Sequence, residues 1–263
     1  MTLPLDALIG PDETCDALSP DFRLLQLRKG HRFSTDDLVT SWRATTAKPN
    51  ATRLLDLGSG IGSVGFGALA LLQHKASLVG IEAQDVSFDL AQRSVLLNGV
   101  QDRVRYVFGD IRDPEVLPAG SSFELITGSP PYMPPGTGIL SPIPQRAACR
   151  HELRGSVFDY CEAARRWLEP EGRFCFVMPT ADERNLRAIE AHGFVLLERF
   201  AIHFRAGVPP LISTFLCARR EDIEPCAPQE GALHVRGDDG EWTDEYFAFR
   251  ALFGVEDPRS KSQ

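Results

Sequence analysis

Long apolar runs are missing from this sequence. No stretch reaches the roughly 18 consecutive apolar residues that a membrane-spanning helix requires. Acidic residues such as Asp6, Asp12 and Glu13 stand near the start, where a secretory signal would have a cationic segment and an apolar core. The sequence therefore predicts a cytoplasmic protein.

Cysteines with the spacing of a metal site are also missing. The six cysteines are scattered, with no Cys-x-x-Cys pair and no interleaved His-x-x-x-His pair. This pattern indicates neither a zinc site nor a small disulfide framework. We expect reduced cysteines and no metal centre.

Positive charge is in short supply. There are 28 Lys and Arg residues against 36 Asp and Glu residues, which gives a formal net charge of −8 at pH 7 and a pI of about 5.3. Non-specific binding to nucleic acid depends on the neutralisation of phosphates by Lys and Arg. The acidic balance therefore argues against it, and any nucleic acid contact must be local.

The length and composition are those of a globular protein with a full core. The chain has 263 residues, of which 43% are hydrophobic and 24% charged. At roughly 150 residues per domain, this length suits one domain with extensions. We expect an N-terminal extension over 1–50, poorly tied down up to about residue 21, a core over 51–220, and a C-terminal hairpin and helix over 221–263. The chain is expected to be a monomer or a weak dimer.

From residue 51 onward, predicted strands alternate with predicted helices. The strands are expected at 54–57, 78–82, 104–108, 123–127 and 172–178, and the helices at 64–73, 85–98, 157–168 and 181–191. This alternation predicts an α/β, Rossmann-like parallel sheet with helices on both faces. Two more strands, 195–204 and 211–218, are too close for a crossover helix. They predict a seven-stranded sheet that an antiparallel strand closes.

Residues that suit a nucleoside ligand follow the first three strands, where ligands of such sheets bind. A glycine loop, Gly58-Ser59-Gly60-Ile61-Gly62, lets the backbone approach a ligand just before a helix begins. Glu82 ends the next strand, at the distance along the chain where an acid takes both hydroxyls of a ribose. Asp110 ends the third strand, and it either accepts from an adenine amine or caps a short helix.

NAD is a competing ligand for such a loop. Against NAD, the loop follows an acidic residue of the strand, Asp56, and no nicotinamide pocket with an obvious His or Tyr base is visible.

The tetrapeptide Ser129-Pro130-Pro131-Tyr132 follows the fourth strand. Each proline fixes its own φ and keeps the residue before it out of the helical region, so the segment forms a rigid rim. Such a rim can hold a flat substrate. Taken alone, it is equally consistent with an ordinary turn.

The order of these motifs resembles that of class I S-adenosyl-L-methionine-dependent methyltransferases that act on amino nitrogens. Over about residues 22–253 the chain also resembles the bacterial tRNA(Val) adenine-N6 methyltransferases, through the segments 29–36, 141–152 and 235–246. The resemblance implies that S-adenosyl-L-methionine is the cofactor and that the segment near Phe33 closes over it. The implied cofactor-binding residues are Phe33, Asp37, Asp56, Gly58, Ser59, Gly60, Gly62, Glu82, Ala83, Asp110, Ile111 and Ser129.

The tetrapeptide departs from the family pattern, which is Asn-Pro-Pro-Tyr. There, the Asn carbonyl and the first proline's carbonyl accept the hydrogens of the reacting amine, and the Tyr stacks on the base. The resemblance gives these catalytic roles to Ser129, Pro130 and Tyr132. A Ser hydroxyl accepts hydrogen bonds but is shorter and can also donate. Because Ser-Pro-Pro-Tyr resembles the form found in cytosine-N4 amino methyltransferases, the target atom stays open.

Basic residues after the tetrapeptide are candidates for substrate binding, namely Arg146, Arg150 and His151. They suit phosphates or a substrate carboxylate, unless they serve only in ion pairs along a helix. Our first hypothesis is methylation of a base amine in RNA, with tRNA adenine N6 favoured. The alternatives are methylation of a small heteroaromatic metabolite and a non-catalytic protein that binds the cofactor.

Overall fold

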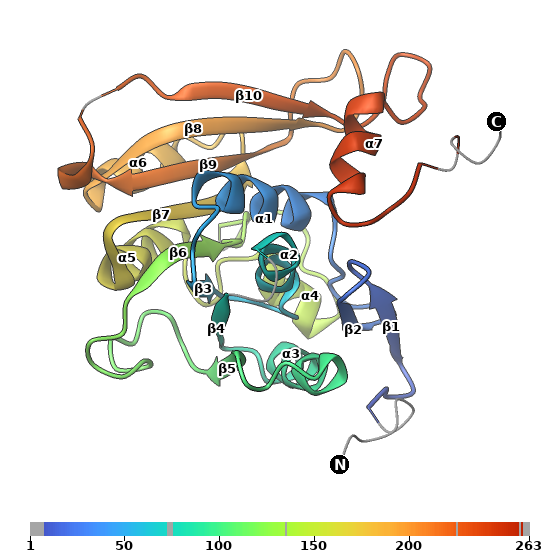
Figure 1. Cartoon of the computed structure of the whole chain (residues 1–263), viewed down its shortest axis with the longest axis horizontal. Coiled ribbons are helices and arrows are strands. Elements are labelled where there is room, and N and C mark those ends of the chain that lie inside the picture. Colours follow the sequence, from blue (N-terminus) through green and yellow to red (C-terminus); the bar gives the residue numbers. More distant parts are fainter. Residues whose placement is uncertain (1–7, 73–75, 135, 225, 258, 260–263) are drawn as a thin grey trace.

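An eight-stranded sheet forms the centre of the molecule (Figure 1). The computed structural model describes residues 8–72, 76–134, 136–224, 226–257 and 259. The strand order is β10-β8-β9-β7-β6-β3-β4-β5. The strands are β3 (Arg53–Leu57), β4 (Ser77–Glu82), β5 (Val104–Phe108), β6 (Phe123–Gly128), β7 (Leu168–Pro179), β8 (Phe194–His203), β9 (Ile212–Arg219) and β10 (Gln229–His234).

Only β9 runs against the other described strands of this sheet. The mostly parallel sheet and the antiparallel pair of β8 and β9 are therefore confirmed. The sheet has one strand more than predicted, because β10 pairs in parallel with β8. We expected a strand in this region only over 233–236. The first residues of β10, which are Gln229, Glu230 and Gly231, lack the apolar alternation that marks a strand.

Helices cover both faces of the sheet, as predicted. Leu55 and Leu57 of β3 pack in one cluster with Val157 and Tyr160, whereas Leu54 packs on the opposite face in a cluster with α2. This alternation follows from the two-residue period of a strand that is buried on both sides. The helices are α1 (Thr35–Ala47), α2 (Ser63–Leu72), α3 (Asp85–Asn98), α4 (Pro144–Arg150), α5 (Val157–Trp167), α6 (Arg184–Ala191) and α7 (Asp244–Ala251), with a 3₁₀ turn at Arg220–Asp222.

A small hairpin precedes α1, outside the main sheet. Its strands, β1 (Glu13–Ala17) and β2 (Arg23–Leu27), are antiparallel. Arg93 of α3 forms an ion pair with Glu13 at 2.7 Å, and the amide of Leu25 donates to Ser94 Oγ at 3.0 Å. The expectation of a poorly tied N-terminal segment is therefore wrong for residues 8–21. The segment contains a polar strand, β1, which is stabilised by pairing with β2 and by contacts with α3.

None of the helices in the described ranges is both long and apolar enough to cross a bilayer.

Candidate active site

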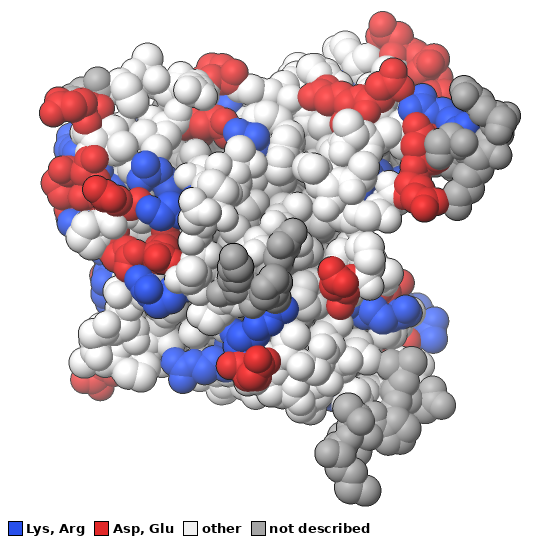
Figure 2. Space-filling model, viewed as in Figure 1, with Lys and Arg blue, Asp and Glu red and all other residues white. Residues whose placement is uncertain are grey.

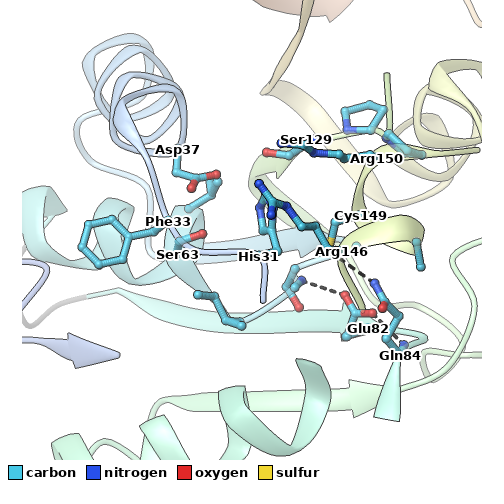
Figure 3. A pocket seen from close by; sticks show the side chains of 18 of the residues that line it. His31, Phe33, Asp37, Ser63, Glu82, Gln84, Ser129, Arg146, Cys149 and Arg150 are labelled. Carbon is cyan, nitrogen blue, oxygen red and sulfur yellow. Dashed lines mark hydrogen bonds between the residues drawn. The ribbon is translucent and has the colours of Figure 1, made fainter. Parts of the chain in front are cut away.

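A cavity of about 830 Å³ lies at the carboxyl ends of β3, β4, β5 and β6 (Figure 3). The chain winds outward from β3 through β4 to β5 and then returns on the other side of β3 as β6. This is the switch in strand order at which open α/β sheets bind ligands, and the volume is typical of a small-molecule site. The remaining walls come from residues of α4 and from the basic turn before α1, which is residues 28–32.

The glycine loop between β3 and α2 forms one wall. Gly58 and Gly60 have φ values of 56° and 55°, a region that side chains with a Cβ rarely adopt. A Cβ on Gly58 would lie 1.9 Å from the hydroxyl oxygen of Tyr160, whereas a Cβ on Gly60 would meet no heavy atom within 4 Å. The backbone at Gly60 therefore faces open space that a ligand can approach closely.

Glu82, at the end of β4, lies beside this loop. Its Oε2 accepts a hydrogen bond from the amide of Gly60 at 2.7 Å, and its Oε1 accepts from the amide of Gln84 at 2.6 Å. Burial raises the pKa of Glu82, while these backbone donors act in the opposite direction. Figure 3 shows Glu82 and Gln84 at the opposite end of the cavity from Asp37.

Two more carboxyl groups are buried in the cavity wall. Asp56 accepts from Thr127 Oγ1 at 2.7 Å and from the amide of Gly65 at 3.2 Å, and burial raises its pKa to about 6. Asp37 accepts from the amide of Ser34 at 3.0 Å, and burial raises its pKa well above the ordinary value. Both carboxyl groups thus hold neighbouring chain segments in place.

Asp110 follows β5 at the rim of the cavity. Its carboxylate forms an ion pair with Arg112 at 2.6 Å, and Arg112 holds the pKa of Asp110 below its ordinary value. The next residue, Ile111, is buried and packs in the core cluster that contains α5. Both residues line the cavity. The carboxylate is charged, and its oxygens can accept a hydrogen bond from an amine.

The tetrapeptide Ser129-Pro130-Pro131-Tyr132 lies in the same cavity as the glycine loop. Ser129 Oγ is buried and has no hydrogen-bond partner within the described ranges. The hydroxyl of Tyr132 donates to Asp36 Oδ2 at 3.2 Å, which anchors the ring to the first turn of α1. The segment therefore presents an unpaired polar atom and an aromatic ring beside each other.

Cationic side chains line the cavity from two directions. Arg28 and Lys29 come from the turn after β2, together with the imidazole of His31, and Arg146 and Arg150 come from α4. Figure 3 shows Arg146 beside His31. Burial lowers the pKa of His31, and the charges of Arg150 and Arg146 lower it further against the influence of Asp36. His31 is therefore held neutral among cations.

Two predicted site residues lie outside the cavity lining. His151 is buried at 2% exposure, because its backbone forms a parallel bridge with Met133 directly after α4. Gly62, the last residue of the glycine loop, does not line the cavity, and a Cβ there would lie 2.3 Å from the hydroxyl oxygen of Tyr106. The other predicted residues line the cavity: Phe33, Asp37, Asp56, Gly58, Ser59, Gly60, Glu82, Ala83, Asp110, Ile111, Ser129, Pro130, Tyr132, Arg146 and Arg150.

Gln145 of α4 organises the site, although it was not among the predicted site residues. Its Oε1 accepts from the amide of His31 at 3.0 Å, and its Nε2 donates to Ser87 Oγ at 3.1 Å. The side chain thus joins the basic turn to α4 and α3. A Cβ at Gly30 would lie 2.2 Å from this Oε1, so the glycine permits the approach. Asp36, which accepts a hydrogen bond from Tyr132, was also not predicted. In both cases the partner is distant in the sequence.

Comparison with known proteins identifies related methyltransferases. No protein-family profile matches the chain. A tRNA1(Val) (adenine(37)-N6)-methyltransferase of Tolumonas auensis is 28% identical over 237 residues, which cover 88% of this chain and 93% of the relative. A release factor glutamine methyltransferase of Mycobacterium tuberculosis is 28% identical over 213 residues, or 76% of this chain and 66% of the relative.

A solved structure confirms the fold. A predicted O-methyltransferase from Agrobacterium tumefaciens superposes with a TM-score of 0.58 at 18% identity, covering 83% of this chain and 96% of that chain. Together, these similarities confirm the predicted resemblance, the fold class, the enzyme class and the use of S-adenosylmethionine.

Proposed function

We propose that this class I S-adenosylmethionine-dependent methyltransferase transfers the methyl group to the exocyclic amine of a base in RNA, specifically adenine N6 of a tRNA. The observation that carries the proposal is that Ser129-Pro130-Pro131-Tyr132 shares one cavity with the glycine loop and Glu82. Relatives named tRNA1(Val) (adenine(37)-N6)-methyltransferase, which align with most of the chain, support this acceptor. A tRNA acceptor implies activity in the cytoplasm.

The cavity fits the cofactor in size and in donor chemistry. Open space next to the Gly60 backbone admits a ligand. The carboxylate of Glu82 accepts one backbone hydrogen bond on each oxygen, which leaves lone pairs for the hydroxyls of a ribose. Asp110 and Phe33 line the same cavity, and we assign Asp110 as the acceptor for the adenine amine. When bound, S-adenosylmethionine supplies an electrophilic methyl group on a positively charged sulfur.

The tetrapeptide supplies what the acceptor amine needs. The lone pair of an aromatic amine is delocalised into its ring, so the site must accept the N–H hydrogens and hold the nitrogen in line. Ser129 Oγ, which lacks a partner in the described part of the chain, and the carbonyl of Pro130 serve as the acceptors. The ring of Tyr132 stacks on the base. With the cofactor bound, the amine nitrogen would bond to the methyl carbon as the sulfur–methyl bond breaks, the neutral thioether would leave, and the nitrogen would release a proton to solvent. Positioning would account for most of the acceleration.

Unpaired cations at the cavity support an RNA acceptor in spite of the net charge of −8. In the described ranges, Arg28, Lys29, Arg146, Arg150 and Arg154 line the cavity and form no ion pair. On the face shown in Figure 2, acidic and basic side chains are interspersed, without one extended basic surface. Phosphate contacts are therefore expected near the target base, where they position the RNA for the tetrapeptide.

The test is methyl transfer to tRNA transcripts by the purified protein, with tRNA binding measured at several salt concentrations. We expect transfer to an adenine amine, and binding that weakens as salt increases. Absence of tRNA binding at low salt would contradict an RNA acceptor. Transfer to a free heteroaromatic amine instead would support the second candidate, a small metabolite, which the short hydroxyl at Ser129 favours. Absence of transfer to any acceptor would support a non-catalytic role.

A further inference from the structure

The loop between β8 and β9, residues 204–211, lies at the same edge of the sheet as the catalytic cavity. β8 runs in the direction of the parallel strands, so its last residue, His203, is at the carboxyl edge. Leu211, at the far end of the loop, lines the catalytic cavity. The loop thus continues the cavity wall away from the tetrapeptide.

A second, smaller cavity lies beside this loop. Its volume is about 420 Å³, and it lies between loop 204–211 and the loop 235–243 that connects β10 to α7. Both loops are at the α7 end of β8 and β10 in Figure 1. The lining residues are Arg205, Ala206, Arg236, Gly237, Asp238 and Gly240. No role in the proposed chemistry involves any of them.

The charged groups of this cavity suit an anion. Arg205 is exposed and forms no ion pair or hydrogen bond within the described part of the chain. One guanidinium nitrogen of Arg236 donates to the carbonyl of Gly240 at 2.6 Å, which fixes the group and leaves its other donors available. Two guanidinium groups share the lining with one carboxylate, that of Asp238, while the neighbouring Asp239 accepts from the amide of Glu241 at 2.9 Å. A phosphate matches the fork geometry of such a pair.

Exposed apolar side chains separate this cavity from the catalytic one. Val208 and Leu211 are 54% and 70% exposed, and Phe204 is 37% exposed. The loop that carries them is fixed, since His203 Nδ1 lies 3.2 Å from the carbonyl of Val208 and the amide of Thr180 donates to the carbonyl of Leu211 at 3.1 Å. Unpaired bases bind by contact with apolar and aromatic side chains between phosphate contacts.

We infer that loops 204–211 and 235–243 form a docking surface for the RNA acceptor, on which Arg205 and Arg236 bind a backbone phosphate near the target base. The inference rests on the proposed function and extends it to a surface outside the active site. Two features favour RNA over a protein partner: the two guanidinium groups that line one cavity, and the exposed apolar side chains that lead through Leu211 to the catalytic cavity. Single-stranded nucleotides next to the target adenine fit this path.

The experiment compares Arg205→Glu and Arg236→Glu with Arg220→Glu. Arg220 is an exposed arginine directly after β9, at the opposite edge of the sheet, and it controls for the change in net charge. tRNA affinity is measured across a range of salt concentrations, together with KM for tRNA, kcat and the affinity for S-adenosylmethionine.

We expect Arg205→Glu and Arg236→Glu each to raise KM and Kd for tRNA by about tenfold at low salt and to reduce the salt slope by about one. The kcat at saturating tRNA and the cofactor affinity should be unchanged, and Arg220→Glu should behave as wild type. Wild-type tRNA affinity and salt slope in Arg205→Glu would overturn the inference while the proposed function stands. If Arg236→Glu misfolds and loses cofactor binding, the result for Arg205→Glu still tests the inference, because Arg205 is exposed and unpaired in the described part of the chain. A wild-type enzyme that methylates no tRNA would instead refute the proposed function itself.

Discussion

The hydroxyl oxygen of Tyr132 lies 3.2 Å from Oδ2 of Asp36, across 96 positions of the chain. This hydrogen bond ties the tetrapeptide after β6 to the first turn of α1. The neighbouring Thr35 is in turn hydrogen-bonded through its hydroxyl to that of Tyr246 in α7, at 3.1 Å. The ring proposed to stack on the acceptor base is therefore held by the first turn of α1 as well as by the segment that follows β6.

Removing this hydroxyl should weaken catalysis without unfolding the protein. We expect Tyr132→Phe to lower kcat/KM for the acceptor about tenfold, because a hydrogen bond to a charged group contributes roughly 1.5–3 kcal/mol. Tyr132→Ala should cost considerably more, since it also removes the stacking surface. Steady-state kinetics with tRNA measure both, and Asp36→Asn should resemble Tyr132→Phe. Wild-type kinetics in Tyr132→Ala would refute the stacking role.

Glu82 is expected to control cofactor affinity. Glu82→Gln keeps the size of the side chain but replaces one acceptor oxygen with a donor, opposite a backbone amide that needs an acceptor. We expect S-adenosylmethionine to bind at least tenfold more weakly in titration calorimetry, from a loss of roughly 1.5–3 kcal/mol. The matched control is Glu230→Gln, at an exposed carboxylate on β10 that pairs with Arg199. Equal affinity in the two variants would count against the ribose assignment.

Asp56 should make stability depend on pH. Burial raises its pKa to about 6 in the folded protein, compared with about 3.9 in an unfolded chain. The folded state therefore holds this proton more tightly, and the resulting stabilisation is complete below about pH 4 and lost as the pH rises through about 6. The shift corresponds to about 3 kcal/mol.

The measurement is urea denaturation of wild type and Asp56→Asn at several pH values. The free energy of unfolding of wild type minus that of the variant should fall by about 2 kcal/mol between pH 4 and pH 7. A constant or rising difference over this range would contradict the assignment of the raised pKa to Asp56.

Ser129 should decide how well the acceptor amine is held. Ser129→Ala removes the buried hydroxyl that has no partner in the described structure. We expect kcat for methyl transfer to fall about tenfold, with KM for S-adenosylmethionine changed far less, because the lost hydrogen bond is made to the reacting amine. Ser129→Asn, which restores the usual family residue, tests the target atom by mass spectrometry of the methylated product. An unchanged kcat in Ser129→Ala would remove Ser129 from the mechanism.

The sequence predicted the mostly parallel sheet and many of the residues that line the cavity, for a physical reason. Strands buried on both faces appear as short apolar runs, and the residues directly after them meet at one edge of a parallel sheet. Contacts between distant segments could not be predicted in this way. Gln145 holds the amide of His31 across 114 positions, and β1 is a polar segment stabilised by its hairpin partner and by Arg93.

His151 shows the limit of inference from charge patterns. Next to Arg150, it was predicted to bind substrate, but the chain turns directly after α4 and buries it beneath the bridge to Met133. β10 shows a second limit, because the start of that strand is defined by pairing with β8 and not by its own residues.

The most direct test of the central claim is mass spectrometry of nucleosides from total tRNA of cells that lack the gene. We expect one methylated adenine nucleoside, N6-methyladenosine, to decrease or disappear. Expression of the wild-type protein should restore it, and expression of Tyr132→Ala should not. An identical nucleoside profile in cells with and without the gene would contradict the proposal that this methyltransferase acts on a tRNA base.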